Sequence, residues 1–282
     1  MRVFILTLLA MIAFGGNSLL CRLALKRTTI DAASFTFIRI LSGAVALWLV
    51  VMIRQGTRPK TRGNWTSALA LFAYAAAFSF AYLSLSAGTG ALLLFGAVQA
   101  TMITWGLSQG ERLRTRQWLG LALAVAGLVA LLFPGLSAPA INGALLMLCA
   151  GIAWGFYSLR GKGAGDPVTT TAGNFWRAVV FATVLSIALL PWARLDRAGV
   201  GYAVLSGAIA SGVGYVIWYS ALPGLKAASA ATMQLSVPVL AAAGGILFLG
   251  ESITLRFLLA SIAVLGGIAL VVIEKKQAVL PD

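Results

Sequence analysis

The chain has 282 residues, of which 60% are hydrophobic and 10% are charged, with a net charge of +14 and a mean hydropathy of +0.96. So few charged side chains cannot cover the surface of a water-soluble protein of this length, which excludes that class and indicates an integral membrane protein. The basic residues lie between long apolar runs, so they indicate topology at a membrane surface rather than nucleic-acid binding.

Ten apolar runs are each long enough for a membrane-spanning helix, which needs about 20 residues. We predict an all-α protein with transmembrane helices at about 2–24, 31–53, 64–87, 89–108, 114–133, 140–160, 168–191, 199–222, 226–249 and 253–274. The first run is shaped like a signal peptide, but Leu20 is not the small residue that cleavage requires, so we interpret it as a helix of the mature protein. Lys and Arg are more frequent on the side of the amino terminus, which predicts that both termini lie inside the cell.

Aromatic and polar residues share helix faces in the first half of the chain. Phe14 and Asn17 share a face of the first span, and Tyr74, Phe78 and Tyr82 recur every four residues in the third. A polar group that finds no partner in lipid is costly. We interpret these residues as the walls of a central substrate cavity. The alternative is that they make interhelical hydrogen bonds or lie in the aromatic belt at the membrane interface.

The second half carries a corresponding set. Trp154 and Tyr157 lie in the sixth span at the positions that match Phe14 and Asn17, and Tyr215 and Tyr219 lie in the eighth. Because both halves present such residues, we predict a cavity that both halves line.

Two amides and a proline interrupt other apolar runs. Gln99 lies in the fourth span, and Gln234 lies in the ninth, one turn before Pro238. A proline inside a helix frees a backbone carbonyl and kinks the helix, which would suit a gate. The amides are interpreted either as substrate contacts or as helix–helix hydrogen bonds across small residues.

Arg39 in the second span and Arg177 in the seventh are the two charges deepest in the predicted helices. A buried arginine can hold the carboxylate of a substrate. It can equally be a structural anchor that bonds to backbone carbonyls or extends to water. Both interpretations stay open for the pair.

The two halves of the chain are copies of each other. Glu111 and Glu251 each follow a glycine, and they are separated by 140 residues, the same offset that carries Gly15 onto Gly155. We therefore predict two repeats, residues 1–138 and 139–282. Five helices in each repeat are an odd number, so the second repeat would enter the membrane from the opposite side. Such inverted repeats occur in secondary transporters, whose substrate site lies between the halves near the midplane.

The sequence lacks the residues that several kinds of catalytic and binding site require. It contains no His, its seven acidic residues lie at or near the ends of predicted helices, and no phosphate-binding Gly-x-x-x-x-Gly-Lys-Ser/Thr loop is present. We therefore expect no catalytic residue, no cofactor, no metal site and no ATP-binding partner. The same absences favour a facilitator over a proton-coupled pump, which usually needs a carboxylate or His inside the membrane.

These motifs resemble the drug/metabolite transporter superfamily, in its ten-helix EamA-type branch, over essentially the whole chain. The residues that carry the resemblance are Gly110-Glu111, Gly250-Glu251, Leu235-x-x-Pro238, Phe37-Ile38-Arg39, Ala13-Phe14-Gly15 and Ala153-Trp154-Gly155. The resemblance implies a ten-helix inverted repeat around a substrate cavity, with the last helix of each repeat packed outside. Within the superfamily the chain is most similar to bacterial amino acid exporters, including those for aromatic amino acids.

The sequence thus predicts a bacterial inner-membrane exporter of amino acids with apolar or aromatic side chains, which works by alternating access. Its partners would be a small-molecule substrate and the lipid bilayer. Two alternatives are a multidrug exporter of flat organic cations with the same fold and a membrane scaffold that transports nothing.

Overall fold

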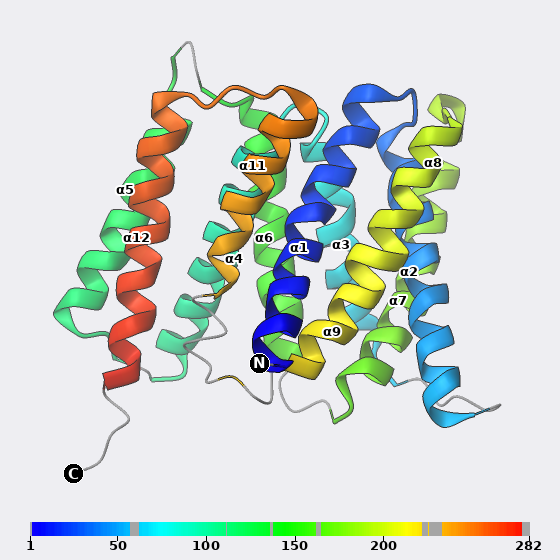
Figure 1. Ribbon diagram of the computed structural model, residues 1–282, viewed down its shortest axis with the longest axis horizontal. Coiled ribbons are helices and arrows are strands. Elements are labelled where there is room, and N and C mark those ends of the chain that lie inside the picture. The colour runs from blue at the N-terminus through cyan, green and yellow to red at the C-terminus, as the bar shows by residue number, and fades with distance from the viewer. Residues whose placement is uncertain are drawn as a thin grey trace.

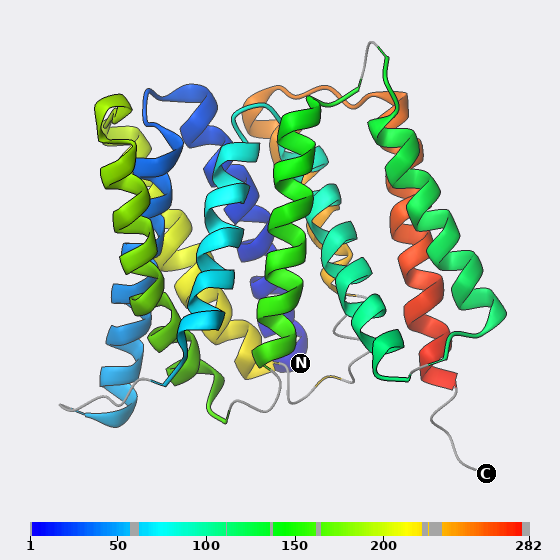
Figure 2. The same cartoon turned by 180° about the vertical axis from the view of Figure 1, so that it is seen from behind.

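The computed structural model describes residues 2–56, 62–110, 112–135, 138–161, 165–221, 225 and 233–277, with side chains described as far as residue 272. These residues form one bundle of helices (Figures 1 and 2). The helices are α1 (Arg2–Arg27), α2 (Ala32–Gln55), α3 (Trp65–Ala81), α4 (Ala87–Ser108), α5 (Thr115–Leu132), α6 (Ile141–Gly161), α7 (Pro167–Ala188), the 3-10 turn η1 (Leu190–Trp192), α8 (Arg197–Val204), the π-helix η2 (Leu205–Val213), α9 (Gly214–Ala221), α11 (Ser236–Leu249) and α12 (Leu255–Gln277).

The lengths of these helices suit a membrane protein. Eight helical segments of the described residues are long and apolar enough to cross a membrane, with α8, η2 and α9 forming one of them. The helices α3 and α11 are shorter and also apolar. The predicted all-α membrane fold is therefore confirmed. α12 ends at the face of the bundle from which α1 starts (Figure 1).

The structure corrects two predicted helix boundaries. The third helix ends at Ala81, six residues before the predicted end, because the segment 82–86 forms a turn and the Ser86 hydroxyl caps the start of α4 by accepting a hydrogen bond from the Thr89 N–H (3.3 Å). The ninth predicted helix begins in part of the chain, 226–232, that lies outside the described residues. Its described part is interrupted at Leu235, and Pro238 lies in the first turn of α11. A proline ring collides with the carbonyl four residues earlier, which accounts for an interruption at this place.

Side chains at the helix starts account for where several helices begin. The Asp31 carboxylate caps α2 by accepting hydrogen bonds from the Ala33 and Ser34 N–H groups, both 2.9 Å, and also accepts one from the Arg194 N–H (2.8 Å). Burial disfavours the charged carboxylate, but its hydrogen bonds to Ser34, Arg194 and Ala33 outweigh burial and hold the pKa of Asp31 below its ordinary value. Asp31 thereby fixes α2 to the segment that precedes α8.

The most extensive helix contacts all join the first half of the chain to the second, in matching pairs. α2 packs on α7, α4 on α11, and α5 on α12. The contacts of α6 with α3 and α4 have their counterparts in the contacts of α1 with the α8–η2–α9 segment and with α11. Likewise α3 packs on α7, and α2 packs on η2. The halves therefore interlock rather than lie side by side as separate units.

α5 and α12 stand at one end of the bundle and contact mainly each other (Figures 1 and 2). Gly120 and Gly267 allow this pair to approach closely, because a Cβ atom on either would collide with the carbonyl oxygen of the other. The remaining helices enclose the central core.

Candidate functional site

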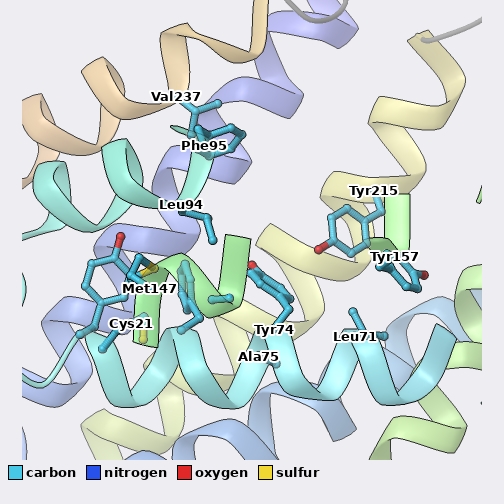
Figure 3. Packing of buried hydrophobic residues seen from close by; sticks show 14 of the residues in the cluster. Cys21, Leu71, Tyr74, Ala75, Leu94, Phe95, Met147, Tyr157, Tyr215 and Val237 are labelled. Carbon is cyan, nitrogen blue, oxygen red and sulfur yellow. The ribbon is translucent and has the colours of Figure 1, made fainter. Parts of the chain in front are cut away.

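Aromatic rings from α1, α3, the turn after α3, α6, α7 and α9 meet between the two halves and form what we call the aromatic cluster. Its members are Phe14, Tyr74, Phe78, Tyr82, Trp154, Tyr157, Phe175, Tyr215 and Trp218. Tyr74 of α3 and Tyr215 of α9 extend towards one another from opposite sides (Figure 3). The Trp154 ring of α6 contacts both, with centroid distances of 4.8 Å to Tyr74 and 5.2 Å to Tyr215.

Two members of the aromatic cluster were missed by the sequence reasoning. Trp218 packs on Phe14 at 6.1 Å, and Phe175 packs on Tyr215 at 6.1 Å. Trp218 could have been found, because it follows Tyr215 by three residues and so shares its helix face. No sequence signal distinguishes Phe175 from the other phenylalanines.

A buried polar network crosses the cluster and centres on the Tyr74 hydroxyl. That hydroxyl accepts hydrogen bonds from the Arg39 NH2 atom (2.8 Å) and from the Asn17 Nδ2 atom (3.3 Å). The Ser206 hydroxyl of η2 in turn donates to the Asn17 Oδ1 atom at 2.6 Å. All four side chains are buried. The sequence reasoning did not single out Ser206, which lies in the apolar, small-residue run that forms η2.

The two deep arginines have different surroundings. Arg39 is 2% exposed, and its guanidinium carbon lies 4.7 Å from the centroid of the Phe78 ring. Arg177 is only partly buried, and its NH1 atom donates to the Gly173 carbonyl at 2.8 Å and to the Arg62 carbonyl at 3.4 Å. Arg177 thus has the contacts of a structural anchor, whereas Arg39 belongs to the polar network of the aromatic cluster.

Three predicted tyrosines lie at the margins of this network. The Tyr82 hydroxyl donates to the Ala87 carbonyl (3.2 Å) across the turn between α3 and α4. The Tyr157 hydroxyl accepts from the Asn174 Nδ2 atom at 3.4 Å. Tyr219, one turn beyond Tyr215 on α9, is partly buried.

The two predicted glutamines are not contacts of the aromatic cluster in this structure. Gln99 faces α5 and α12, where it lines a narrow apolar void with residues such as Leu121 and Ile268. Gln234 is partly buried just before the interruption at Leu235. An open apolar groove of about 550 Å³ lies between α5 and α12 and includes none of the predicted substrate-binding residues.

A polar contact that we call the Arg22–Glu251 latch joins the ends of four helices, α1, α3, α4 and α11, next to Tyr82 of the aromatic cluster. Arg22 near the end of α1 pairs with Glu251 at 3.2 Å (Nε to Oε1) and donates to the Tyr82 carbonyl at 2.8 Å. The other Glu251 oxygen accepts from the Ala87 N–H at the start of α4 (2.8 Å). A carboxylate is favourable at that helix start because the helix dipole is positive there.

The two halves form a bundle of apolar helices that encloses buried rings and a polar network. This is the arrangement of a polytopic membrane protein with the architecture of a transporter. A model of the EamA-like transporter family matches residues 1–133 and again residues 141–273. The chain therefore belongs to the EamA-like transporter family, whose members are transporters rather than enzymes. The resemblance noted in the sequence is confirmed.

Several known proteins are similar to this chain. The chain is 58% identical to uncharacterized protein PA1977 of Pseudomonas aeruginosa, over 96% of this chain and 94% of that protein. It is 34% identical to the threonine/homoserine exporter RhtA of Salmonella typhimurium, over 54% of this chain and 53% of RhtA. A crystal structure with 17% sequence identity superposes with a TM-score of 0.67 over 97% of this chain and 99% of that one, a likeness of fold alone.

Proposed function

We propose that this protein exports amino acids with apolar or aromatic side chains across a bacterial inner membrane by alternating access. The observation that carries the proposal is the aromatic cluster, in which Tyr74, Trp154 and Tyr215 join rings from both halves around buried polar groups. Aromatic walls suit apolar side chains, and a few fixed polar groups suit the polar end of an amino acid. The partial similarity to the threonine/homoserine exporter RhtA supports the substrate class.

The architecture behind this proposal is a ten-helix inverted repeat of residues 1–138 and 139–282. The matched helix pairs support it, since a two-fold relation between the halves would pair α2 with α7, α4 with α11 and α5 with α12. The two separate matches of the family model support it as well. Rocking of one repeat against the other would expose the cluster to each side in turn.

The bias of basic residues favours both termini in the cytoplasm. In that orientation the Arg22–Glu251 latch lies on the outer side of the membrane, because Arg22 is near the outer end of the first helix. The described conformation would then be closed on the outside. Pro238, at the helix interruption at the start of α11 and so at the opposite end of that helix from Glu251, remains our candidate gate residue.

The test is uptake of a panel of radiolabelled amino acids into proteoliposomes, with and without an imposed pH gradient. We expect neutral amino acids to be taken up independently of the gradient, since no described carboxylate lies in the polar network. Uptake that follows the gradient would replace the facilitator with a proton-coupled transporter. Uptake of organic cations without amino acids would replace amino acid export with multidrug export.

A pair of tryptophan variants tests the site. Trp154→Ala should lower uptake about tenfold or more without loss of folded protein, since losing an aromatic contact worth about 1.5 kcal/mol weakens binding by that factor. Trp118→Ala is the matched control, because Trp118 lies on α5 and is 52% exposed. Equal uptake by both variants would show that the aromatic cluster is not the substrate site.

A further inference from the structure

Arg39 is a buried charge whose hydrogen bonds are incomplete. Its NH2 atom donates to the Tyr74 hydroxyl, but its NH1 atom is buried and has no hydrogen-bond partner. Among the side chains that the structure describes, the one ion pair is that of Arg22 with Glu251, so no described carboxylate pairs with Arg39. A buried guanidinium is expected to be paired or fully hydrogen-bonded, because an unmatched charge in an apolar interior is costly.

Tyr74 has a free donor beside the same guanidinium. Its hydroxyl oxygen accepts from Arg39 and from Asn17, and both of those partners are donors. A phenol can donate one hydrogen bond in addition to those it accepts. The hydroxyl hydrogen is therefore not used in either bond. Arg39 NH1 and the Tyr74 O–H are thus two donors, one of them charged, that the protein itself does not satisfy at this point.

Arg177, the other arginine that the sequence places deep in a predicted helix, makes its hydrogen bonds to the protein backbone although its side chain is only partly buried. The NH1 atom of Arg177 donates to two backbone carbonyls, Gly173 and Arg62. A structural anchor would be expected to look like Arg177. Arg39 is more deeply buried and its NH1 atom makes no hydrogen bond, so it does not have this pattern.

We propose that Arg39 NH1 and the Tyr74 hydroxyl bind the carboxylate of the substrate, and that this carboxylate defines the substrate class. Two neighbouring donors, one charged, match the two oxygens of a carboxylate. The amino group of an amino acid would meet ring faces rather than an acid, since no described carboxylate lies in the network. The substrate class is therefore monocarboxylates with an apolar or aromatic side chain, for which the amino group is dispensable.

This inference rests on the proposed function for the position of the site, and binding of isosteric probes tests it separately. Isothermal titration calorimetry of the full chain in lipid nanodiscs would compare L-phenylalanine with 3-phenylpropionate, which lacks the amine, and 2-phenylethylamine, which lacks the carboxylate. L-leucine, 4-methylpentanoate and 3-methylbutylamine form a second set. We expect each carboxylate to bind within about tenfold of its amino acid and each amine about ten- to a hundredfold more weakly than the matching carboxylate, as for loss of a charged hydrogen bond.

Variants assign the effect to Arg39. Arg39→Gln should weaken binding of 3-phenylpropionate about ten- to a hundredfold, and Arg39→Lys should restore it only in part, because an ammonium lacks the planar fork of a guanidinium. Tyr74→Phe keeps the ring and should cost about tenfold, which preserves the test if Arg39 variants fail to fold. Arg177→Gln is the matched control and should bind like the unaltered protein.

The outcomes separate the two proposals. Binding of the carboxylates without transport of any amino acid would contradict amino acid export and leave the carboxylate subsite standing. Transport of amino acids with normal binding in folded Arg39→Gln would overturn the subsite and leave export standing. Amines that bind as tightly as the carboxylates, or carboxylates that fail to bind in both sets, would overturn the subsite.

Discussion

Tyrosines on one helix stripe have different surroundings in this protein. Tyr74 and Tyr82 lie two turns apart in the third predicted helix, and both are buried. The Tyr74 hydroxyl is the centre of the polar network, whereas the Tyr82 hydroxyl bonds to a backbone carbonyl in the α3–α4 turn. The Tyr82 ring also packs where a side chain on Gly90 would have to lie, so Gly90 and Tyr82 together shape that turn.

We therefore expect Tyr82→Phe to affect stability rather than transport. The variant loses one buried hydrogen bond, worth about 1 kcal/mol, and leaves the Ala87 carbonyl without that donor. Thermal unfolding in detergent should show a lower Tm, while uptake at a temperature at which both proteins are folded should be unchanged. A loss of uptake as large as that of Trp154→Ala, with an unchanged Tm, would instead assign Tyr82 to the substrate site.

At the scale of helices, the Arg22–Glu251 latch joins elements from both halves at a single point. α1, the turn before α4 and the segment between α11 and α12 meet there, and both charged side chains are about nine-tenths buried. Such a contact would hold one end of the bundle closed, and the alternating access that we propose would require it to open.

Glu251→Gln should make that end open more often. The amide keeps an oxygen for the Ala87 N–H but loses the charge that pairs with Arg22, which is worth about 1.5–3 kcal/mol for a charged hydrogen bond. Ala87→Cys, in a background with Cys21→Ala and Cys149→Ala, reports opening through its reaction with a maleimide in nanodiscs. We expect reaction about tenfold faster or more with Glu251→Gln than with Glu251. Equal rates would mean that the latch does not control access to this end.

The length of the apolar runs predicted where helices occur. It was less informative about where each helix ends and which neighbouring helices it contacts. The hydropathy of the third span continues past Ala81, and it does not register the turn at 82–86 that the Ser86 cap and the Tyr82 hydroxyl stabilise. The π-helix η2 lies in an apolar run whose sequence predicts an ordinary α-helix, and in the structure η2 packs against α1 and α2.

Only part of the candidate site was predicted, because residue spacing does not show which way each helix faces in the bundle. Ring spacing identified the stripe of α3 and its partners Trp154 and Tyr215, whereas the direction in which Gln99 points depends on how α4 is rotated against α5 and α12. Arg39 and Arg177 could not be told apart from sequence, because their partners come from other helices and loops: the Tyr74 hydroxyl for one and the Arg62 carbonyl for the other.

At the scale of the whole molecule, the two halves depend on each other. Their most extensive helix contacts are contacts with the opposite half. A chain divided between Ala138 and Pro139 should therefore regain transport when both fragments are made together, and each fragment made alone should be degraded. Immunoblots of membranes and uptake assays measure the two results, with the undivided chain as reference. A stable, protease-resistant fragment 1–138 on its own would contradict this interdependence.

The hydrogen bond between Ser206 and Asn17 joins residues 189 positions apart. At about 5–20 residues per second, a ribosome needs roughly 10–40 s to add that length of chain. During this interval Asn17 has been made while its partner Ser206 in η2 has not. A first half whose synthesis stalls before Ser206 therefore keeps a polar group in the membrane without this partner, which is costly in lipid.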